Sequence, residues 1–239
     1  MNRFHNQGKA GLGMAALLGG TGFMVSSAAF EKIGGWCTQS ISEDLEMSAQ
    51  CALAEVPIAW VPKAVTYDEQ PLTFRESLKQ RRRWTSGTLQ IAGSWLPAIG
   101  RRLAERPLIQ TLDMGATMLI PAYQAAAVVS MAVTALAAGF IHPGAFSPLL
   151  CLGYIAGNLL ITVLGATLSA MLVLTVEEKW DRRLLPALCF YWFFLLSWVV
   201  LTMSCVFKKT TVWEEIRHTR NVSAPGKMKL KQRNQVLAP

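Results

Sequence analysis

Charged residues are scarce in this chain, and two long stretches have none at all. Only 16% of its 239 residues are Asp, Glu, Lys or Arg, whereas a soluble domain carries about a quarter. The 63 residues from Met114 to Val176 and the 24 from Leu184 to Phe207 are uncharged. Because a helix of about 20 apolar residues spans a bilayer core, these runs exclude a disordered chain and a purely soluble enzyme.

The chain also lacks a cysteine framework. Its five cysteines form no CxxC pair and have no His at metal-ligand spacing. The cysteines are Cys37, Cys51, Cys151, Cys189 and Cys205. Three of them lie within apolar runs, so we expect buried thiols rather than disulfides or a zinc site.

The positive charge is concentrated at the C-terminus. Residues 1–113 hold 12 Lys and Arg against 10 Asp and Glu, while the tail from Lys208 holds 8 against 2. A basic tail beside an apolar segment suits anionic lipid headgroups better than nucleic acid. No basic stripe is interleaved with aromatic residues, so we expect a bilayer partner and no nucleic acid.

The N-terminal segment has some features of a secretory signal peptide. It begins with a basic stretch, residues 2–9, followed by the uncharged stretch Ala10–Phe30. Five glycines dilute that stretch, and glycine is a poor helix former. We therefore predict that Leu17–Ser26 is a loop or strand of a folded domain. The alternative, a signal peptide, would put residues 1–113 outside the cell.

The residues after this segment predict a helix followed by a strand. A segment at 31–36 ends in two glycines, which stop a helix. Ser40 and Glu43 have capping-box spacing, and apolar residues then recur at helical period, predicting a helix from about Ile41 to Glu55. Ile58–Tyr67 is short and rich in β-branched and aromatic residues, which predicts a strand.

A second predicted helix begins at Thr73, after Pro71. Its apolar positions recur every three or four residues, and its other faces carry five Lys and Arg residues. The basic residues are Arg75, Lys79, Arg81, Arg82 and Arg83. A basic amphipathic helix of this kind is expected to lie at a membrane surface. A linker containing Pro97 and three arginines is predicted to follow.

The apolar stretches predict about three membrane helices. A Pro-Gly turn at 142–144 divides the first stretch into helices near Met114–Phe140 and Leu149–Val176, and Leu184–Phe207 is a third. Three full spans put the basic tail outside if residues 1–113 are cytosolic, yet a basic tail favours the cytosol. Either the third segment enters the membrane without crossing it, or the preference of positively charged segments for the cytosolic side is overridden.

Two groups of residues are candidates for chemistry. Acidic residues such as Glu43 and Asp44 are common in the first turn of a helix, where the helix dipole favours them. The second group, residues 80–84, reads by itself as the cationic face of an interfacial helix. Each group alone therefore has a purely structural interpretation.

The order of several short motifs along the chain favours a functional interpretation of these two groups. The motifs are Gly19-Gly20-Thr21-Gly22-Phe23, Ile33-Gly34-Gly35-Trp36, Ser42-Glu43-Asp44-Leu45, Tyr67-Asp68-Glu69-Gln70-Pro71-Leu72-Thr73 and Gln80-Arg81-Arg82-Arg83-Trp84. An acidic pair followed about 36 residues later by QxxRW and then by apolar helices resembles the membrane-bound glycosyltransferase family 2 enzymes. That family includes synthases of cellulose, chitin, hyaluronan and poly-N-acetylglucosamine. The tail from Lys208 to Arg220 also resembles the juxtamembrane tail of bacterial members.

The resemblance implies roles for individual residues. Asp44, in its pair with Glu43, matches the general base that deprotonates the acceptor hydroxyl. Gln80 and Arg83 match residues near the donor diphosphate, and a guanidinium suits phosphate oxygens. Trp84 matches the indole on which the acceptor sugar stacks.

Two further expectations follow from the same resemblance. Gly20, Thr21 and Gly22 would line the acceptor site, where missing side chains allow close approach of the backbone. In the family, aspartates of a DxD motif hold Mg²⁺ or Mn²⁺ against the UDP phosphates, and no segment of this chain matches them. We therefore expect the C-terminal part of an enzyme that is inactive alone.

The resemblance implies an α/β fold: a partial GT-A-type cytosolic portion followed by an α-helical transmembrane bundle. The expected regions are 1–72 (transferase domain), 73–113 (interfacial helix and linker), 114–207 (transmembrane) and 208–239 (basic tail). The expected function is inverting, processive transfer from a UDP-sugar to a growing polysaccharide, at a bacterial inner membrane with the catalytic part in the cytosol. Alternatives are a non-processive transferase with a lipid acceptor and a non-catalytic scaffold or transporter subunit.

Overall fold

The computed structural model describes residues 6–64, 66, 68–141 and 148–208, and the regular structure in these ranges is helical. The elements are α1 (Gly8–Gly11), α2 (Ser27–Lys32), α3 (Glu43–Leu53), α4 (Phe74–Glu105), α5 (Ile109–Ile141), α6 (Pro148–Val176), the 3-10 turn η2 (Arg182–Leu184) and α7 (Leu185–Phe207). No strand occurs in the described ranges, so the predicted α/β fold is wrong.

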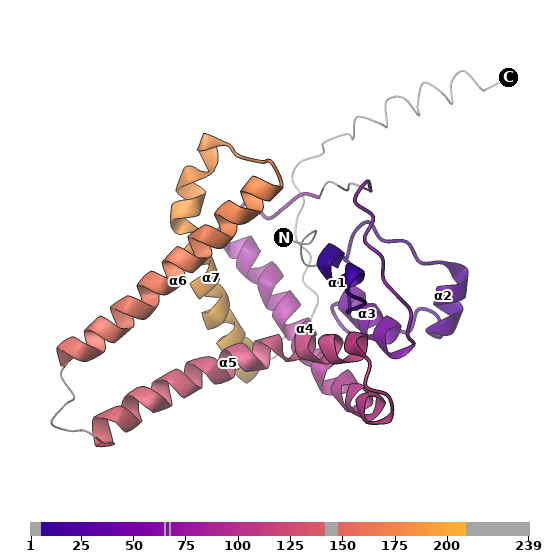
Figure 1. The fold of residues 1–239 in the computed structure, drawn as a ribbon, viewed down its shortest axis with the longest axis horizontal. Coiled ribbons are helices and arrows are strands. Elements are labelled where there is room, and N and C mark those ends of the chain that lie inside the picture. Colours follow the sequence, from indigo (N-terminus) through magenta and orange to yellow (C-terminus); the bar gives the residue numbers. More distant parts are fainter. Residues whose placement is uncertain (1–5, 65, 67, 142–147, 209–239) are drawn as a thin grey trace.

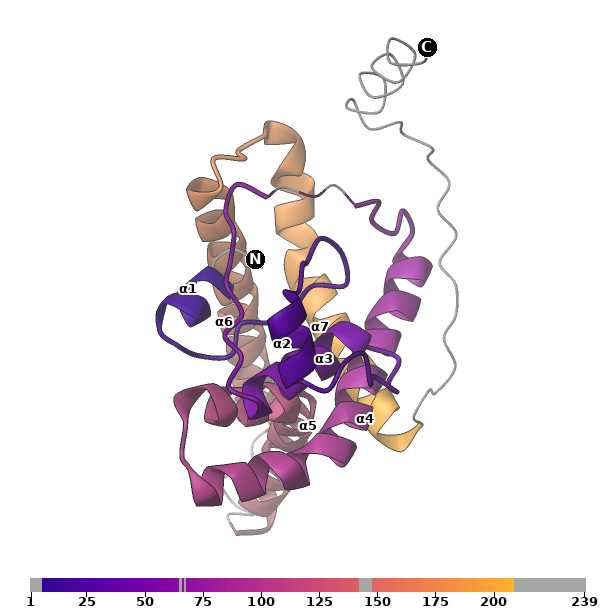
Figure 2. The same ribbon diagram turned by 90° about the vertical axis from the view of Figure 1, so that its right-hand side faces the viewer.

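The helices divide between the two ends of the molecule. In Figure 1, α1, α2 and α3 gather at one end, while α5 and α6 extend toward the other. Helix α4 connects these parts, and α7 lies alongside it in both views (Figures 1 and 2). The QxxRW helix is therefore positioned between the N-terminal segment and the apolar helices.

In its described residues, the predicted strand at Ile58–Tyr67 is an irregular connection with a turn at 62–63 instead. Its described residues form no ladder with another segment of the described chain. Pro57 precedes the segment and Pro62 interrupts it, and proline cannot donate a hydrogen bond to a neighbouring strand. A segment becomes a strand only where a partner satisfies its backbone polar groups, and the described part of the chain pairs no strand with it.

Helix α3 forms close to where the sequence predicts it, but with different capping. The predicted capping box of Ser40 and Glu43 is wrong, because Ser42 is the N-cap and its side chain caps nothing. The carboxylate of Glu46 instead accepts hydrogen bonds from the backbone amides of Gln39 (2.9 Å) and Ser40 (2.7 Å). Glu46 thus holds the chain that leads into α3.

Helix α4 begins as predicted and ends later. Thr73 and Glu76 form a reciprocal capping box at its start. The helix then continues through Pro97 to Glu105, so the predicted linker is wrong. Proline removes the hydrogen bond to the carbonyl four residues earlier, here that of Gly93, and both residues are exposed where water can serve that carbonyl.

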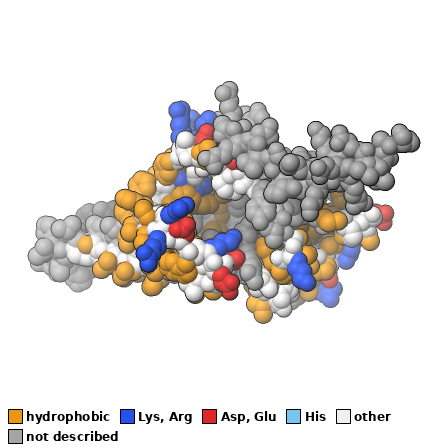
Figure 3. All heavy atoms as spheres, turned by 90° about the horizontal axis from the view of Figure 1, so that it is seen from above, with side chains coloured by type: hydrophobic (Ala, Val, Ile, Leu, Met, Phe, Trp, Pro, Cys, Tyr) orange, Lys and Arg blue, Asp and Glu red, His pale blue; other side chains and the backbone are white. Residues whose placement is uncertain are grey.

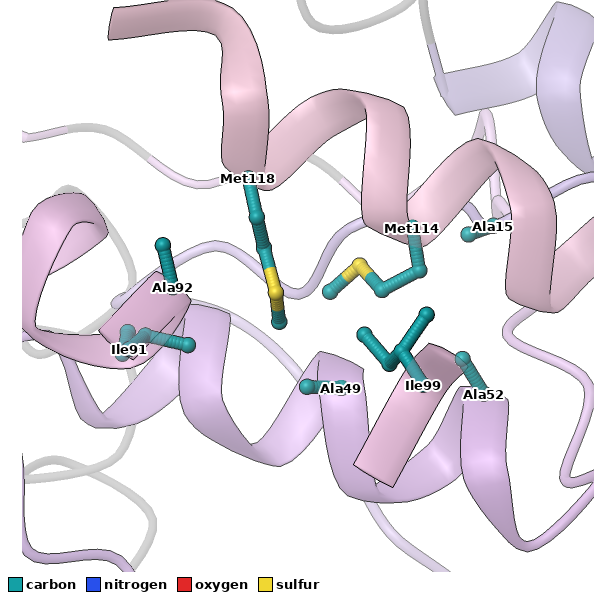
Figure 4. Packing of buried hydrophobic residues seen from close by; sticks show 8 residues of the cluster. All are labelled: Ala15, Ala49, Ala52, Ile91, Ala92, Ile99, Met114 and Met118. Carbon is teal, nitrogen blue, oxygen red and sulfur yellow. The ribbon is translucent and has the colours of Figure 1, made fainter. Parts of the chain in front are cut away.

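A small apolar core joins α3, α4 and α5 (Figure 4). Met114 and Met118 of α5 point toward buried side chains of the other two helices. These side chains are Ala49 and Ala52 of α3 and Ile91, Ala92 and Ile99 of α4. Because α3 and α4 carry the candidate residues, this core determines how the two motifs face each other.

The predicted apolar helices agree with α5, α6 and α7, although α5 begins earlier than expected. Within the described residues, one helix, Arg182–Phe207, is long and apolar enough to cross a membrane by length and composition. On the face shown in Figure 3, hydrophobic side chains predominate toward α5 and α6, and charges of both signs lie nearer the middle and right.

Candidate functional site

Asp44 lies in the first turn of α3 and is half-buried. Its Oδ1 accepts a hydrogen bond from the backbone amide of Leu45 at 2.8 Å. A Cβ atom placed on Gly20 would lie 3.4 Å from its Oδ2. The glycine loop therefore borders the carboxylate, and a larger side chain at position 20 would crowd it.

One buried serine attaches the glycine loop to α3. The Ser48 hydroxyl donates to the carbonyl of Asp44 at 2.7 Å and accepts from the amide of Leu18 at 2.9 Å. Ser48 is only 1% exposed, so neither bond competes with bulk water. This arrangement fixes the distance between the loop and the Asp44 backbone.

The QxxRW motif presents one face of α4. Residues at i, i+3, i+4 and i+7 share a helix face, so Gln80, Arg83 and Trp84 lie on the same side as Gly87. A Cβ atom on Gly87 would overlap the hydroxyl of Ser42 and lie 2.8 Å from its Cβ. The missing side chain allows α4 to contact the residue just before Glu43, which puts Arg83, one turn earlier, near Asp44.

The electrostatic surroundings raise the pKa of Asp44. Burial is the largest cause, and the neighbouring Glu43 carboxylate adds to it. The Leu45 amide and the Arg83 guanidinium act in the opposite direction. A carboxylate with a raised pKa is a stronger proton acceptor, so this site suits general-base chemistry.

The other two residues of the glycine loop contact the connection between α3 and α4. Thr21 donates a hydrogen bond to Asp68 Oδ2 at 2.5 Å. Gly22 has a φ of +75°, and a Cβ there would overlap the methyl group of Thr66. Of the predicted acceptor loop, only Gly20 directly borders Asp44.

The remaining predicted site residues have fewer contacts with the group around Asp44. Trp84 is 41% exposed and stacks on Trp198 of α7, with ring centroids 6.2 Å apart. Glu43 is exposed and Gln80 is half-buried, and neither forms a hydrogen bond or ion pair with another described residue. The structure thus brings Gly20, Asp44 and Arg83 together.

Sequence reasoning missed the contact between the QxxRW helix and α7. Arg81, predicted on the cationic outer face of the helix, is 1% exposed and lies over the ring of Phe194 at 4.2 Å. Trp198 lies in an apolar run that carried no functional signal. The position of Arg81 within the QxxRW motif is a signal in the sequence, but its partner Phe194, 113 residues away, could not be inferred from spacing.

The described residues hold no preformed cluster of metal ligands. Among them, no group of three or more His, Cys, Asp or Glu side chains could hold a metal ion. Mg²⁺ is usually held by only one or two carboxylates together with water and substrate phosphates.

The chain is similar in sequence to known glycosyltransferases. Over 81 residues, or 34% of its length, the chain is 30% identical to the "Probable glycosyltransferase YdaM" of Bacillus subtilis (strain 168), covering 19% of that protein. No solved structure matches the chain. Residues 1–207 match the family described as "Glycosyl transferase family group 2". With most of its length covered by this match, the chain belongs to glycosyl transferase family group 2.

Proposed function

We propose that this chain carries the acceptor-side groups of an inverting transfer from a UDP-sugar to a growing polysaccharide at a membrane. The observation that carries the proposal is the Asp44 carboxylate. It is half-buried, has a raised pKa, borders Gly20 and experiences the positive charge of the Arg83 guanidinium. Carboxylates whose pKa is perturbed by burial and by specific charged neighbours cluster at functional sites.

Asp44 acts as the general base. Its Oδ2 takes the proton of an acceptor hydroxyl while that oxygen forms a bond to the anomeric carbon of the donor. The bond between the anomeric carbon and the diphosphate breaks, and its electron pair leaves with the diphosphate. General-base assistance contributes about 10² to 10⁴ in rate.

Arg83 and Trp84 assist on either side of this carboxylate. The guanidinium of Arg83 attracts diphosphate oxygens with a planar fork of donors, for which lysine is a poor substitute. The exposed indole of Trp84 offers an apolar face to the C–H side of a sugar ring. Gln80 is assigned beside Arg83, and Glu43 beside Asp44, on the family resemblance.

We further propose that α5, α6 and α7 cross the membrane together, which makes the chain part of an integral protein of a bacterial plasma membrane. Helices α5 and α6 have 33 and 29 residues, and no charged residue occurs from Met114 to Val176. Helix α4 then lies at the cytosolic surface, where nucleotide sugars are available, and the polymer passes between the helices.

A lipid-linked acceptor is the second candidate. The acceptor indole, Trp84, contacts the apolar helix α7, which would suit a substrate whose lipid remains in the bilayer. The length of the product separates the two candidates, since polymerisation yields a long ladder on a gel and single transfer yields one glycolipid.

The test is an Asp44→Asn substitution in the complete membrane protein. Membranes are incubated with radiolabelled UDP-N-acetylglucosamine or UDP-glucose, and incorporation is measured. We expect incorporation to fall about 10² to 10⁴-fold while the protein remains in the membrane fraction. Glu31→Gln, which removes an exposed carboxylate of α2, is the matched control. Unchanged incorporation by Asp44→Asn would refute the assigned base.

A further inference from the structure

We propose that the acceptor site contains a second indole, Trp198 of α7, and that Arg81 of α4 is the positioning residue that holds it beside Trp84. This inference rests on the proposed function, because it extends the acceptor site. Its ligand is the sugar residue next to the one that receives the transfer.

The two indoles pack against each other as a nearly parallel pair. Their centroids are 6.2 Å apart and their planes differ by 27°. Trp84 is 41% exposed, and Trp198 is half-buried. At this centroid distance the stacked rings are offset, so neither ring covers the other completely. Such a pair suits an oligosaccharide, whose adjacent rings each present a C–H face to an aromatic plane.

Arg81 holds the turn of α7 that carries Trp198. Its Nη1 donates to the hydroxyl of Ser197 at 2.9 Å and to the carbonyl of Phe194 at 3.3 Å. Its guanidinium lies over the ring of Phe194 at 4.2 Å and over that of Trp198 at 5.4 Å. The planar group therefore contacts α7 both through hydrogen bonds and through its face, which limits rotation of the helix.

Packing alone does not explain a cation at this place. Arg81 is 1% exposed, its Nη2 has no hydrogen-bond partner, and no carboxylate of the described residues forms an ion pair with it. Removing an unpaired charge from water is costly, and an apolar side chain of similar volume is often neutral or stabilising at such positions. What arginine supplies and methionine cannot is a rigid fork and a flat face, both directed at the residues around Trp198.

Arg81 and the catalytic face are also connected through α4. Trp84 lies three residues after Arg81 and next to Arg83, at the border between the side of the helix that faces α7 and the side that faces α3. A shift of Trp198 would remove the neighbour that supports Trp84, without moving Asp44. We therefore expect Arg81 to affect acceptor binding rather than proton transfer.

The first test is fluorine NMR of the full chain labelled with 5-fluorotryptophan in detergent. Trp84→Phe and Trp198→Phe assign the two resonances, and chitotetraose or cellotetraose is then added without donor. We expect both resonances to shift, while that of Trp180, which is 50% exposed on the loop before α7, stays in place. If only the Trp84 resonance shifts, the inference is wrong and the proposed function stands. If neither shifts with either oligosaccharide, the proposed acceptor site is wrong as well.

The second test separates positioning from stability. Arg81→Met is expected to unfold at or above the temperature of the unchanged protein, because it removes an unpaired buried charge. The same variant is expected to move the Trp198 resonance. It is also expected to raise the Kd for the oligosaccharide about 3- to 10-fold, because one aromatic contact with the sugar is lost.

Two further variants complete this comparison. Arg81→Lys retains the charge but loses the fork and flat face, so it is expected to bind as weakly as Arg81→Met. Arg75→Met, an exposed position of the same helix, is expected to bind normally. Binding by Arg81→Met equal to that of the unchanged protein would overturn the positioning role.

Discussion

Replacing Gly87 by alanine tests how closely the two catalytic helices approach. A Cβ atom there would overlap the Ser42 hydroxyl and lie 2.8 Å from its Cβ. Carbon atoms prefer separations of about 3.5–4.0 Å, so the start of α3 must move by roughly 1 Å. Rotation of the serine hydroxyl cannot relieve this, because the Cβ is attached to the backbone.

The expected energies can be compared directly. Alanine in place of glycine within a helix gains about 1 kcal/mol, and overpacking costs about 1–3 kcal/mol. The net effect is a loss of about 0–2 kcal/mol, which lowers the melting temperature by up to about 4–8 °C in a protein of this size. Since Asp44 follows Ser42 by two residues, a displacement of roughly 1 Å should reduce transfer about 10²-fold.

Thermal unfolding is monitored by intrinsic fluorescence in one detergent, and sugar incorporation is measured for the same variants. Gly93→Ala is the matched control, because it lies on the same helix with no atom within 4 Å of a new Cβ. It should stabilise the protein by about 1 kcal/mol. Adding Ser42→Gly to Gly87→Ala should restore activity. If Gly87→Ala is stabilised as much as Gly93→Ala and remains active, the close approach of α3 and α4 is refuted.

Three other predictions concern Asp44 and the residues that contact it. The raised pKa of this carboxyl means that activity is lost as pH falls through that pKa. Because Glu43 raises the pKa and Arg83 lowers it, Glu43→Gln should move the acidic limb of the pH–rate profile to lower pH, and Arg83→Gln should move it to higher pH. The folded state also binds this proton more tightly than the unfolded state, so stability falls as pH rises through the same range, and Asp44→Asn should unfold at a higher temperature than the unchanged protein at neutral pH. Ser48→Ala leaves the partly buried amide of Leu18 without its hydrogen-bond partner, and should cost about 1–3 kcal/mol of stability in denaturant unfolding; an unchanged midpoint would contradict this.

Local sequence determined most of the helices. The period of apolar residues, the Thr73 cap and the uncharged runs predict α3, α6, α7 and the start of α4 within a few residues of their bounds, since helical hydrogen bonds join residues only four apart. The order of the short motifs also indicated the family. The predicted strand was wrong because a strand depends on a partner elsewhere in the chain, and composition cannot supply one.

Only the tertiary structure decided how these helices meet. The approach of Gly87 to Ser42 and the contact of Arg81 with the turn that carries Trp198 join residues 45 or more positions apart. Such contacts depend on how whole helices pack, and helix packing admits several angles and registers for the same pattern of apolar residues. Position along the chain could therefore indicate that Asp44 begins a helix, but not that a glycine loop and a guanidinium would lie beside its carboxylate.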